Sequence, residues 1–221
     1  MRYTGIPAAM WVLFKKPFKK NLTEVLGTDR NSVNEIVRNS LSKYKEIISG
    51  LPEFEKGDRF KVNIVSCAML CSFVLSVPHR PDVEKLTEFY SKSMMTSVMK
   101  LFCRIKGRKK FSGSDIAQMK YTAGLKAGDR NPYSWNMEFY EYKDGSGYEA
   151  RFTQCGICTL MKELGLYDMV PAMCRLDYTM SEAGGASEFV RKYTIASGGA
   201  YCDCGYRNLS GKPNAKPGGK V

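Results

Sequence analysis

The sequence predicts an α+β fold, with a helical N-terminal half packed on a small antiparallel β-sheet built from C-terminal hairpins. Apolar residues recur at helical spacing through residues 1–130. After Asn131-Pro132 the pattern changes, and aromatic side chains alternate with polar ones in residues 135–142 and 148–153. Tight turns within each pair of strands imply antiparallel pairing. Strands do not alternate with helices throughout, as Rossmann and TIM folds require.

Helices are expected in order along the first 130 residues. Pro7 opens a helix that includes Trp11 and Phe14, and Pro17 then kinks or ends it. Capping residues such as Ser32 and Asp82 precede later apolar-periodic stretches. Four further helices are expected over residues 31–48, 59–76, 82–105 and 112–125.

The last part of the chain combines two hairpins with a pair of short helices. Asp144-Gly145-Ser146-Gly147 is a turn between the first two strands and marks the clearest hairpin in the chain. Helices over residues 155–164 and 167–181 follow, split by Gly165. Strands over residues 188–196 and 201–207 then flank the turn at Gly198-Gly199.

These elements predict a single α+β domain over residues 1–209. Its first part (1–130) is mainly helical, and its second part (131–209) mixes helices and strands. Residues 210–221 are rich in Gly, Pro and Lys and are expected to form a disordered basic tail.

Composition excludes several classes of protein. The chain has 221 residues, of which 43% are hydrophobic and 25% charged, as is ordinary for a globular protein. His79 is the single histidine, so a Ser-His-Asp or Cys-His site would need it and a zinc site with two histidines is excluded. No stretch approaches the roughly 18 apolar residues of a membrane span. Residues 1–20 lack the order of a signal peptide, so a cytoplasmic location is expected.

Positive charge is concentrated in three stretches. The net charge is +12, and residues 1–20, 100–130 and 207–221 together carry +16, so the remainder of the chain is slightly acidic. A solvated surface, a nucleic-acid partner and an anionic membrane surface are the three interpretations, and no clear nucleic-acid or membrane motif is present. Trp11, Phe14 and Phe18 lie among lysines as in an interfacial helix, but the same spacing is typical of a core face, which we favour.

Five of the eight cysteines lie between residues 155 and 204. Cys155 is expected at the N-terminus of a helix, where peptide N–H groups favour a thiolate. Cys174 and Asp177 are three residues apart, so a shared helix would place them on one face. Strand alternation puts Cys202 and Cys204 on one side of the last strand and Asp203 on the other. The remaining cysteines, Cys67, Cys71 and Cys103, are most simply core residues.

Three chemical interpretations of this segment are open. A thiolate can attack an electrophilic carbon while a carboxylate of Asp177, Asp203 or Glu163 moves protons. Cys155, Cys174 and Cys202 can instead hold zinc, although a second CxxC would be the usual partner of Cys155-x-x-Cys158. A thioredoxin-like dithiol is the third interpretation, but too little chain follows the CxxC for that fold. Cys158 and Cys204 are equally well explained as small core residues.

Several spaced motifs in this region resemble one family. They read FxxC, ELG, CxxD, RxxT, GG and CD in order, and cover roughly residues 130–208. Their residues here are Phe152, Cys155, Glu163, Leu164, Gly165, Cys174, Asp177, Arg191, Thr194, Gly198, Gly199, Cys202 and Asp203. In this order they resemble the bacterial L-2-amino-thiazoline-4-carboxylic acid hydrolase family. Cys204 departs from the pattern, because family members often carry an aromatic residue after the Cys-Asp pair.

The resemblance implies a bacterial, cytoplasmic hydrolase of a non-peptide C–N bond. It would open a small cyclic amidine, such as an aminothiazoline carboxylate, to an N-carbamoyl-cysteine-like product. The resemblance also implies a small anionic, sulfur-containing substrate and allows a homo-oligomer. The expected catalytic residues are Cys155, Cys174, Asp177, Cys202, Asp203 and Glu163, and the expected substrate-binding residues are Arg191 and Thr194.

Two other functions stay open. A non-catalytic module that senses a small molecule or binds a partner, stabilised by zinc through Cys155, Cys174 and Cys202, would explain the cysteines without catalysis. A basic protein bound to nucleic acid or membrane would explain the charge.

Overall fold

The computed structural model describes residues 1–211, and the expected basic tail falls mostly outside them. The chain divides into two compact units, each assembled from two stretches of sequence. The helical unit comprises Met1–Thr96 and Gly156–Leu176, and the sheet unit comprises Ser97–Cys155 and Asp177–Val221. The expectation that residues 1–209 form one domain stays a prediction.

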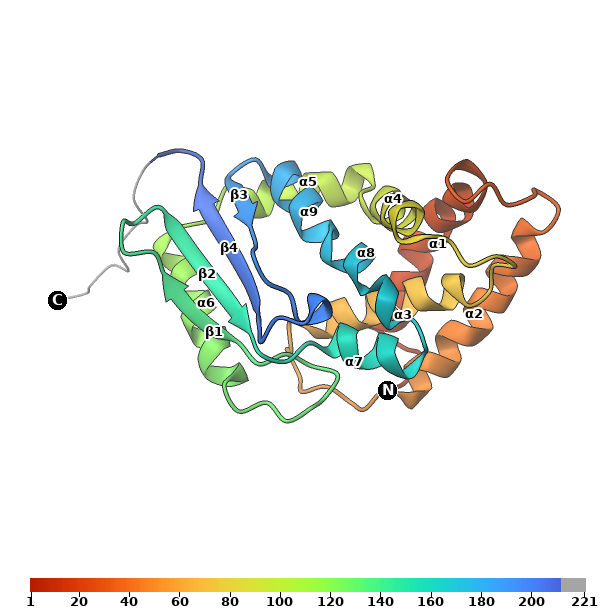
Figure 1. The fold of residues 1–221 in the computed structure, drawn as a ribbon, viewed down its shortest axis with the longest axis horizontal. Helices are drawn as coiled ribbons and strands as arrows, with labels where there is room; N and C mark the ends of the chain where they lie inside the picture. The colour runs from red at the N-terminus through yellow and green to blue at the C-terminus, as the bar shows by residue number, and fades with distance from the viewer. Residues whose placement is uncertain (212–221) are drawn as a thin grey trace. The chain divides into compact units, whose positions relative to one another are not determined.

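The helical unit is built around α3 (Lys61–Val74), which lies among the other helices of this unit (Figure 1). Residues 64–74 of α3 are all buried. Apolar residues fill every side of α3, so neighbouring helices must cover it all round. The side chains of Phe18, Phe73 and Phe89 pack together in the core of the unit, with ring centroids 4.8–6.3 Å apart. The helices of this unit are α1 (Ile6–Glu24), α2 (Val33–Gly50), α3 (Lys61–Val74), α4 (Val83–Met94), α7 (Gly156–Glu163), η1 (Tyr167–Met169) and α8 (Val170–Cys174).

The first helix confirms the core interpretation of its aromatic residues. Trp11, Phe14 and Phe18 are all buried, and Trp11 stacks between Tyr44 and Phe73. Pro17 does not end the helix, which continues to Glu24. These aromatic side chains therefore face other helices of the unit.

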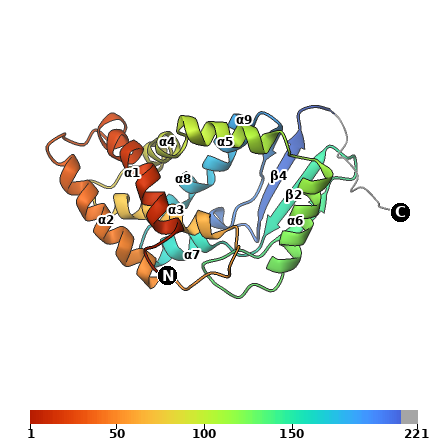
Figure 2. The same ribbon diagram turned by 180° about the vertical axis from the view of Figure 1, so that it is seen from behind.

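The sheet unit contains one antiparallel sheet in the order β1-β2-β4-β3, which confirms the predicted α+β class. Its strands are β1 (Glu138–Glu141), β2 (Gly147–Phe152), β3 (Ser187–Val190) and β4 (Cys202–Asn208), and its helices are α5 (Ser97–Gly107), α6 (Gly113–Lys126) and α9 (Leu176–Gly184). Helix α6 lies across one face of the sheet (Figure 1, Figure 2). The hydroxyl of Tyr148 on β2 donates to the Asp115 carboxylate at the start of α6, 2.9 Å away.

The strand register separates two chemically different faces. Tyr148, Ala150, Cys202, Cys204 and Phe189 share the covered face and are all buried. The opposite face carries Tyr140, Glu149, Arg151, Asp203 and Arg207, which keep contact with solvent. This alternation is what the sequence predicts for a sheet with one face covered.

Three elements differ most from the sequence prediction. The helix expected over residues 82–105 is interrupted at Met95-Thr96, where Met95 leaves helical geometry with ψ of 53°. The helix expected over residues 167–181 is interrupted at Arg175, between α8 and α9. The strand expected over 188–196 ends at Val190, because the following residues form a bonded loop.

Two glycines allow α5 and α9 to approach backbone to backbone. A Cβ atom on Gly107 would lie only 2.3 Å from the carbonyl oxygen of Gly184. A side chain at residue 107 would therefore force the two helices apart, since backbone cannot yield as a flexible side chain does.

We expect Gly107→Ala to lower the free energy of unfolding by about 1–3 kcal/mol, because the methyl group overpacks this crossing. Gly124→Ala is the matched control, since Gly124 is a helical glycine of α6 with open space around it. That control should gain about 0.5–1 kcal/mol from helix propensity. Urea unfolding of both variants measures the difference, and equal stability would contradict the close approach.

Candidate functional site

Cys202 lies at the start of β4, on the covered face of the sheet, and is 7% exposed. The backbone N–H of Ile195 donates to its Sγ atom at 3.2 Å. Burial raises the pKa of the Cys202 thiol, and a charge on Cys155 raises it further, while the Ile195 N–H and Arg191 act in the opposite direction. The raised pKa favours the protonated form of the Cys202 thiol.

Arg191 follows β3 and places a buried positive charge beside this thiol. Its side chain is 5% exposed, and its Nη1 atom donates to a carboxylate oxygen of Asp177 at 3.0 Å. The same nitrogen lies 3.8 Å from Sγ of Cys204. The guanidinium also sits 4.8 Å from the ring centre of Phe189 and 5.4 Å from that of Tyr178. Arg191 thus joins α9 to β4 within the sheet unit.

Asp177 is the carboxylate of this cluster. It lies in the first turn of α9, and its side chain is 44% exposed. Desolvation raises the pKa of its carboxyl group above the ordinary value, while the charge and hydrogen bond of Arg191 act in the opposite direction. A carboxyl group with a raised pKa holds a proton to higher pH than an ordinary aspartate and suits proton transfer.

The loop between β3 and β4 holds the Ile195 N–H in place. Thr194 caps the short helix η2 (Ile195–Ser197), and its Oγ1 atom accepts from the backbone N–H of Ser197 at 3.0 Å. Gly198 has a φ of 84°, a conformation that favours glycine. A Cβ atom on Gly199 would meet the Thr194 carbonyl oxygen at 2.9 Å. The RxxT and GG motifs therefore shape one turn, and Thr194 has a capping contact that accounts for it.

Asp203 faces away from Cys202, as strand alternation predicts. Its carboxylate accepts from the backbone N–H of Lys192 at 2.9 and 3.0 Å and from that of Tyr193 at 2.6 Å. These bonds fasten the start of the loop to β4 from the outer face of the sheet. The geometry favours this anchoring role for Asp203 over proton transfer at the thiols.

Cys155 ends the segment that follows β2 and directly precedes α7, so the sequence prediction of a helix N-terminus is confirmed. It is partly exposed, unlike Cys202, and the two thiols influence each other electrostatically. Peptide N–H groups at a helix start favour a thiolate. Among the cysteines of the sheet unit, Cys155 combines partial exposure with that environment.

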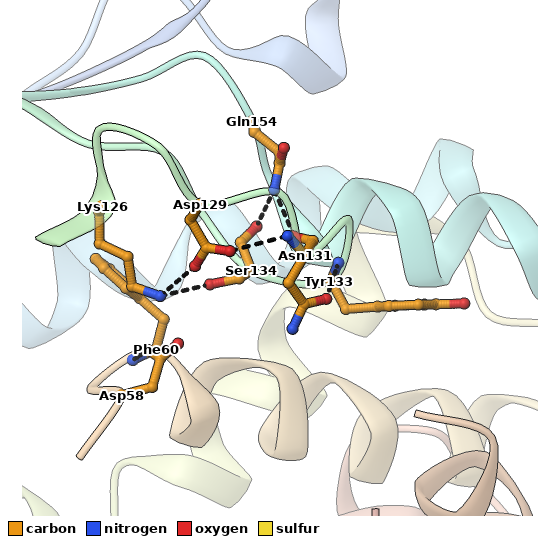
Figure 3. A network of polar contacts seen from close by, with 8 residues as sticks. All are labelled: Asp58, Phe60, Lys126, Asp129, Asn131, Tyr133, Ser134 and Gln154. Carbon is orange, nitrogen blue, oxygen red and sulfur yellow. Dashed lines mark hydrogen bonds and ion pairs between the residues drawn. The ribbon is translucent and has the colours of Figure 1, made fainter. Parts of the chain in front are cut away.

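Gln154 anchors the backbone next to Cys155, a role that sequence reasoning missed. Its side-chain amide donates to the carbonyl oxygens of Asn131 at 2.6 Å and Ser134 at 3.3 Å (Figure 3). This loop is itself tied together by Asp129, whose carboxylate accepts from the Asn131 N–H at 2.9 Å and from Lys126. Lys126 also donates to Ser134 at 2.8 Å. Asp129-Arg-Asn-Pro is a turn signal that could have pointed to this loop.

Two of the other predicted site residues belong to the helical unit. Cys174 ends α8, and Glu163 is the exposed last residue of α7, both in the helical unit. The single helix expected over residues 167–181 is divided between Cys174 and Asp177, although Arg175, between α8 and α9, keeps helical backbone angles. Cys158 is buried on α7, and His79 is exposed between α3 and α4.

The cysteines are all thiols rather than disulfides. Across residues 1–211, no three His, Cys, Asp or Glu side chains gather as a metal ion would require. Zinc held through Cys155, Cys174 and Cys202 stays a prediction. In the same range no helix is long and apolar enough to span a bilayer.

The fold and the cluster define an α+β protein with two neighbouring thiols beside a buried arginine that donates a hydrogen bond to a partly exposed carboxyl group. The family model described as L-2-amino-thiazoline-4-carboxylic acid hydrolase matches residues 82–206, more than half of the chain, so the chain belongs to this family. The match begins at Asp82, the N-cap of α4, well before the motifs that suggested the family. No curated protein and no solved structure matches the chain.

Asp129 should make stability depend on pH. Desolvation opposes its charge, but Lys126, Asn131 and Ser134 together hold the pKa of Asp129 below its ordinary value of 3.8. A lowered native pKa adds stability above the unfolded pKa, and this stability is lost as pH falls through the native pKa. We expect Asp129→Asn to cost about 1–2 kcal/mol at neutral pH and progressively less as the pH falls through the native pKa of Asp129 towards about 2. Unfolding free energies across that range test this.

The control for this experiment is Glu182→Gln, which removes one negative charge from an exposed position on α9. Its effect should stay within about 0.5 kcal/mol. A constant difference between Asp129→Asn and the parent protein down to low pH would contradict the role assigned to the Asp129 carboxylate.

The two neighbouring thiols should differ in reactivity. Cys155 is partly exposed at a helix start, whereas Cys202 is buried and its thiol pKa is raised. We expect iodoacetamide to modify Cys155 at least about tenfold faster at neutral pH, because the thiolate is the reactive form. Timed alkylation with peptide mass spectrometry measures both rates, and equal rates would contradict this assignment.

Proposed function

We propose that the protein hydrolyses a small, anionic, sulfur-containing cyclic amidine, using Cys155 as nucleophile and Asp177 as proton donor. Membership of the hydrolase family supports the reaction class. The observation that carries the residue assignment is the meeting of Cys202, Arg191 and Asp177 in one cluster with Cys155 in electrostatic reach. Family and fold alone do not specify a substrate, so the assignment rests on these contacts.

A comparison of the bonds in the substrate and in the product identifies the bond that is broken. In an aminothiazoline the reacting carbon is bonded to the ring sulfur, the ring nitrogen and the exocyclic nitrogen. An N-carbamoyl cysteine keeps both nitrogens on that carbon. Water therefore adds across the carbon–nitrogen double bond, and the carbon–sulfur bond breaks. The substrate remains a cyclic amidine, but the net cleavage differs from the C–N cleavage expected from the sequence.

The proposed covalent route has two steps. The Cys155 thiolate adds to the amidine carbon as the ring nitrogen takes a proton, and the ring sulfur then leaves and is protonated as a thiol. This leaves an isothiourea on Cys155. Water adds to its carbon, the bond to Cys155 breaks, and the carbamoyl product leaves with the thiolate restored.

Each neighbour has a role that follows from its contacts. Asp177 supplies the proton to the ring nitrogen, since desolvation raises its pKa. Arg191 positions Asp177 and, being 5% exposed and already bonded, leaves the substrate carboxylate to another basic residue. Cys202 stays protonated and contributes a neutral thiol beside the nucleophile. Thr194 and Asp203 hold the loop that presents the Ile195 N–H.

We expect Cys155→Ala to lower turnover of 2-aminothiazoline-4-carboxylate by about 10³-fold or more, because the nucleophile is lost. Cys158→Ala is the matched control, since it removes a buried thiol of the same CxxC. That variant should keep activity within about tenfold of the parent protein. Mass spectrometry of the carbamoyl product provides the readout, and circular dichroism confirms that both variants are folded.

Three outcomes would contradict the proposal. Turnover retained by folded Cys155→Ala would exclude Cys155 as nucleophile. A parent protein that binds but never converts cyclic amidines would contradict the reaction class. About one zinc per chain, with unfolding when a chelator removes it, would favour the non-catalytic zinc-stabilised module.

A further inference from the structure

Helix α5 exposes a continuous apolar stripe. Val98, Leu101, Phe102 and Ile105 are 76%, 55%, 48% and 48% exposed. Their spacing of three and four residues places them on one side of the helix. Single exposed apolar residues are common on protein surfaces, but four on one helix face form a patch.

The opposite side of α5 explains why the stripe faces outward. Cys103 and Gly107 are the buried residues of this helix. Gly107 meets the backbone of Gly184, so the small residues make the internal contact. The large apolar residues of α5 are therefore left on the solvent side.

Basic residues border the stripe, and acidic residues are absent from its neighbourhood in sequence. The border consists of the exposed residues Lys100, Arg104, Lys106, Arg108 and Lys109. No Asp or Glu occurs between Glu88 and Asp115. Lys106 lies over the exposed ring of Phe102, with Nζ 5.5 Å from the ring centre, so charge and apolar surface adjoin directly.

The apolar stripe and its basic border together limit the kinds of partner that α5 can bind. A second copy of the chain meeting the same face would bring two basic borders together, on a protein of net charge +12. A nucleic acid would use the basic residues but would leave the apolar stripe exposed. An anionic lipid surface satisfies both features, because apolar side chains enter the acyl boundary while Lys and Arg meet lipid phosphates.

We infer that α5 is a membrane-surface helix that attaches the sheet unit peripherally to bilayers rich in anionic lipid. The stripe runs from Val98 to Ile105, about 10 Å along the helix axis, so α5 lies in the plane of the interface. The bound surface is the outer side of α5, which carries none of the residues of the candidate catalytic cluster.

The test is sedimentation of the full chain with lipid vesicles under reducing conditions. Phosphatidylcholine vesicles with about 30 mol% phosphatidylglycerol should bind the protein, and pure phosphatidylcholine vesicles should bind it at least about tenfold more weakly. Raising salt from about 0.05 M to about 0.5 M should weaken binding to the anionic vesicles.

Two pairs of variants separate the apolar and the charged contributions. Leu101→Ser should weaken binding about tenfold, whereas Leu125→Ser, at a 62% exposed leucine on α6, should leave it unchanged. The double change Arg104→Glu with Lys106→Glu should abolish binding. The control is the double change Arg38→Glu with Lys56→Glu, which alters the net charge equally at exposed positions of the helical unit. This control should retain most of the vesicle binding.

Several results would overturn the inference. Binding that responds to both charge-reversal pairs equally would indicate attraction by net charge alone. Binding that ignores Leu101→Ser would show that the stripe does not enter the bilayer. Absence of vesicle binding, together with a concentration-dependent dimer that Leu101→Ser dissociates in sedimentation velocity, would assign the stripe to self-association.

Discussion

The buried charge of Arg191 is the constraint on which the candidate site depends. A guanidinium that is 5% exposed must find partners, since an unpaired buried charge costs several kcal/mol. Asp177 on α9 accepts a hydrogen bond from the guanidinium, Cys204 supplies a sulfur acceptor from β4, and the Phe189 ring faces the guanidinium from β3. The contacts that compensate the buried charge of Arg191 thus bring α9, β3 and β4 of the sheet unit together.

The loop after Arg191 places a backbone N–H group against the Cys202 thiol. Asp203 binds the backbone at Lys192 and Tyr193 from one side of the sheet, and Gly199 packs against the Thr194 carbonyl where no side chain fits. Held at both ends, the loop directs the Ile195 N–H at the Cys202 sulfur. The family motifs RxxT, GG and CD therefore form one anchored loop, and most of their residues serve to position its backbone.

Sequence predicted the elements whose signals are local. The hairpin around Gly145 and the alternation that separates Cys202 from Asp203 follow from neighbouring residues, and both are confirmed. The breaks at Met95 and Arg175 lie within stretches of unbroken helical pattern, so periodicity gives no sign of them. The early end of β3 at Val190 depends on Asp203 capturing backbone ten or more residues earlier, and the anchoring of Cys155 depends on Gln154 reaching residue 131. Contacts between residues so far apart produce no periodic pattern in the sequence.

Helices α1 and α5 show that a sequence of alternating apolar and basic residues does not by itself reveal whether the apolar stripe is buried or exposed. Both interleave large apolar residues with lysines, and α1 carries the heavier aromatic content. In α1 the stripe of Trp11, Phe14 and Phe18 is buried, because rings such as Phe73 are available to pack against it. In α5 the internal contact is made by the backbone at Gly107, and a contact between backbones leaves no room for large side chains. The small residues of α5, rather than its large ones, therefore determine which face it turns to solvent.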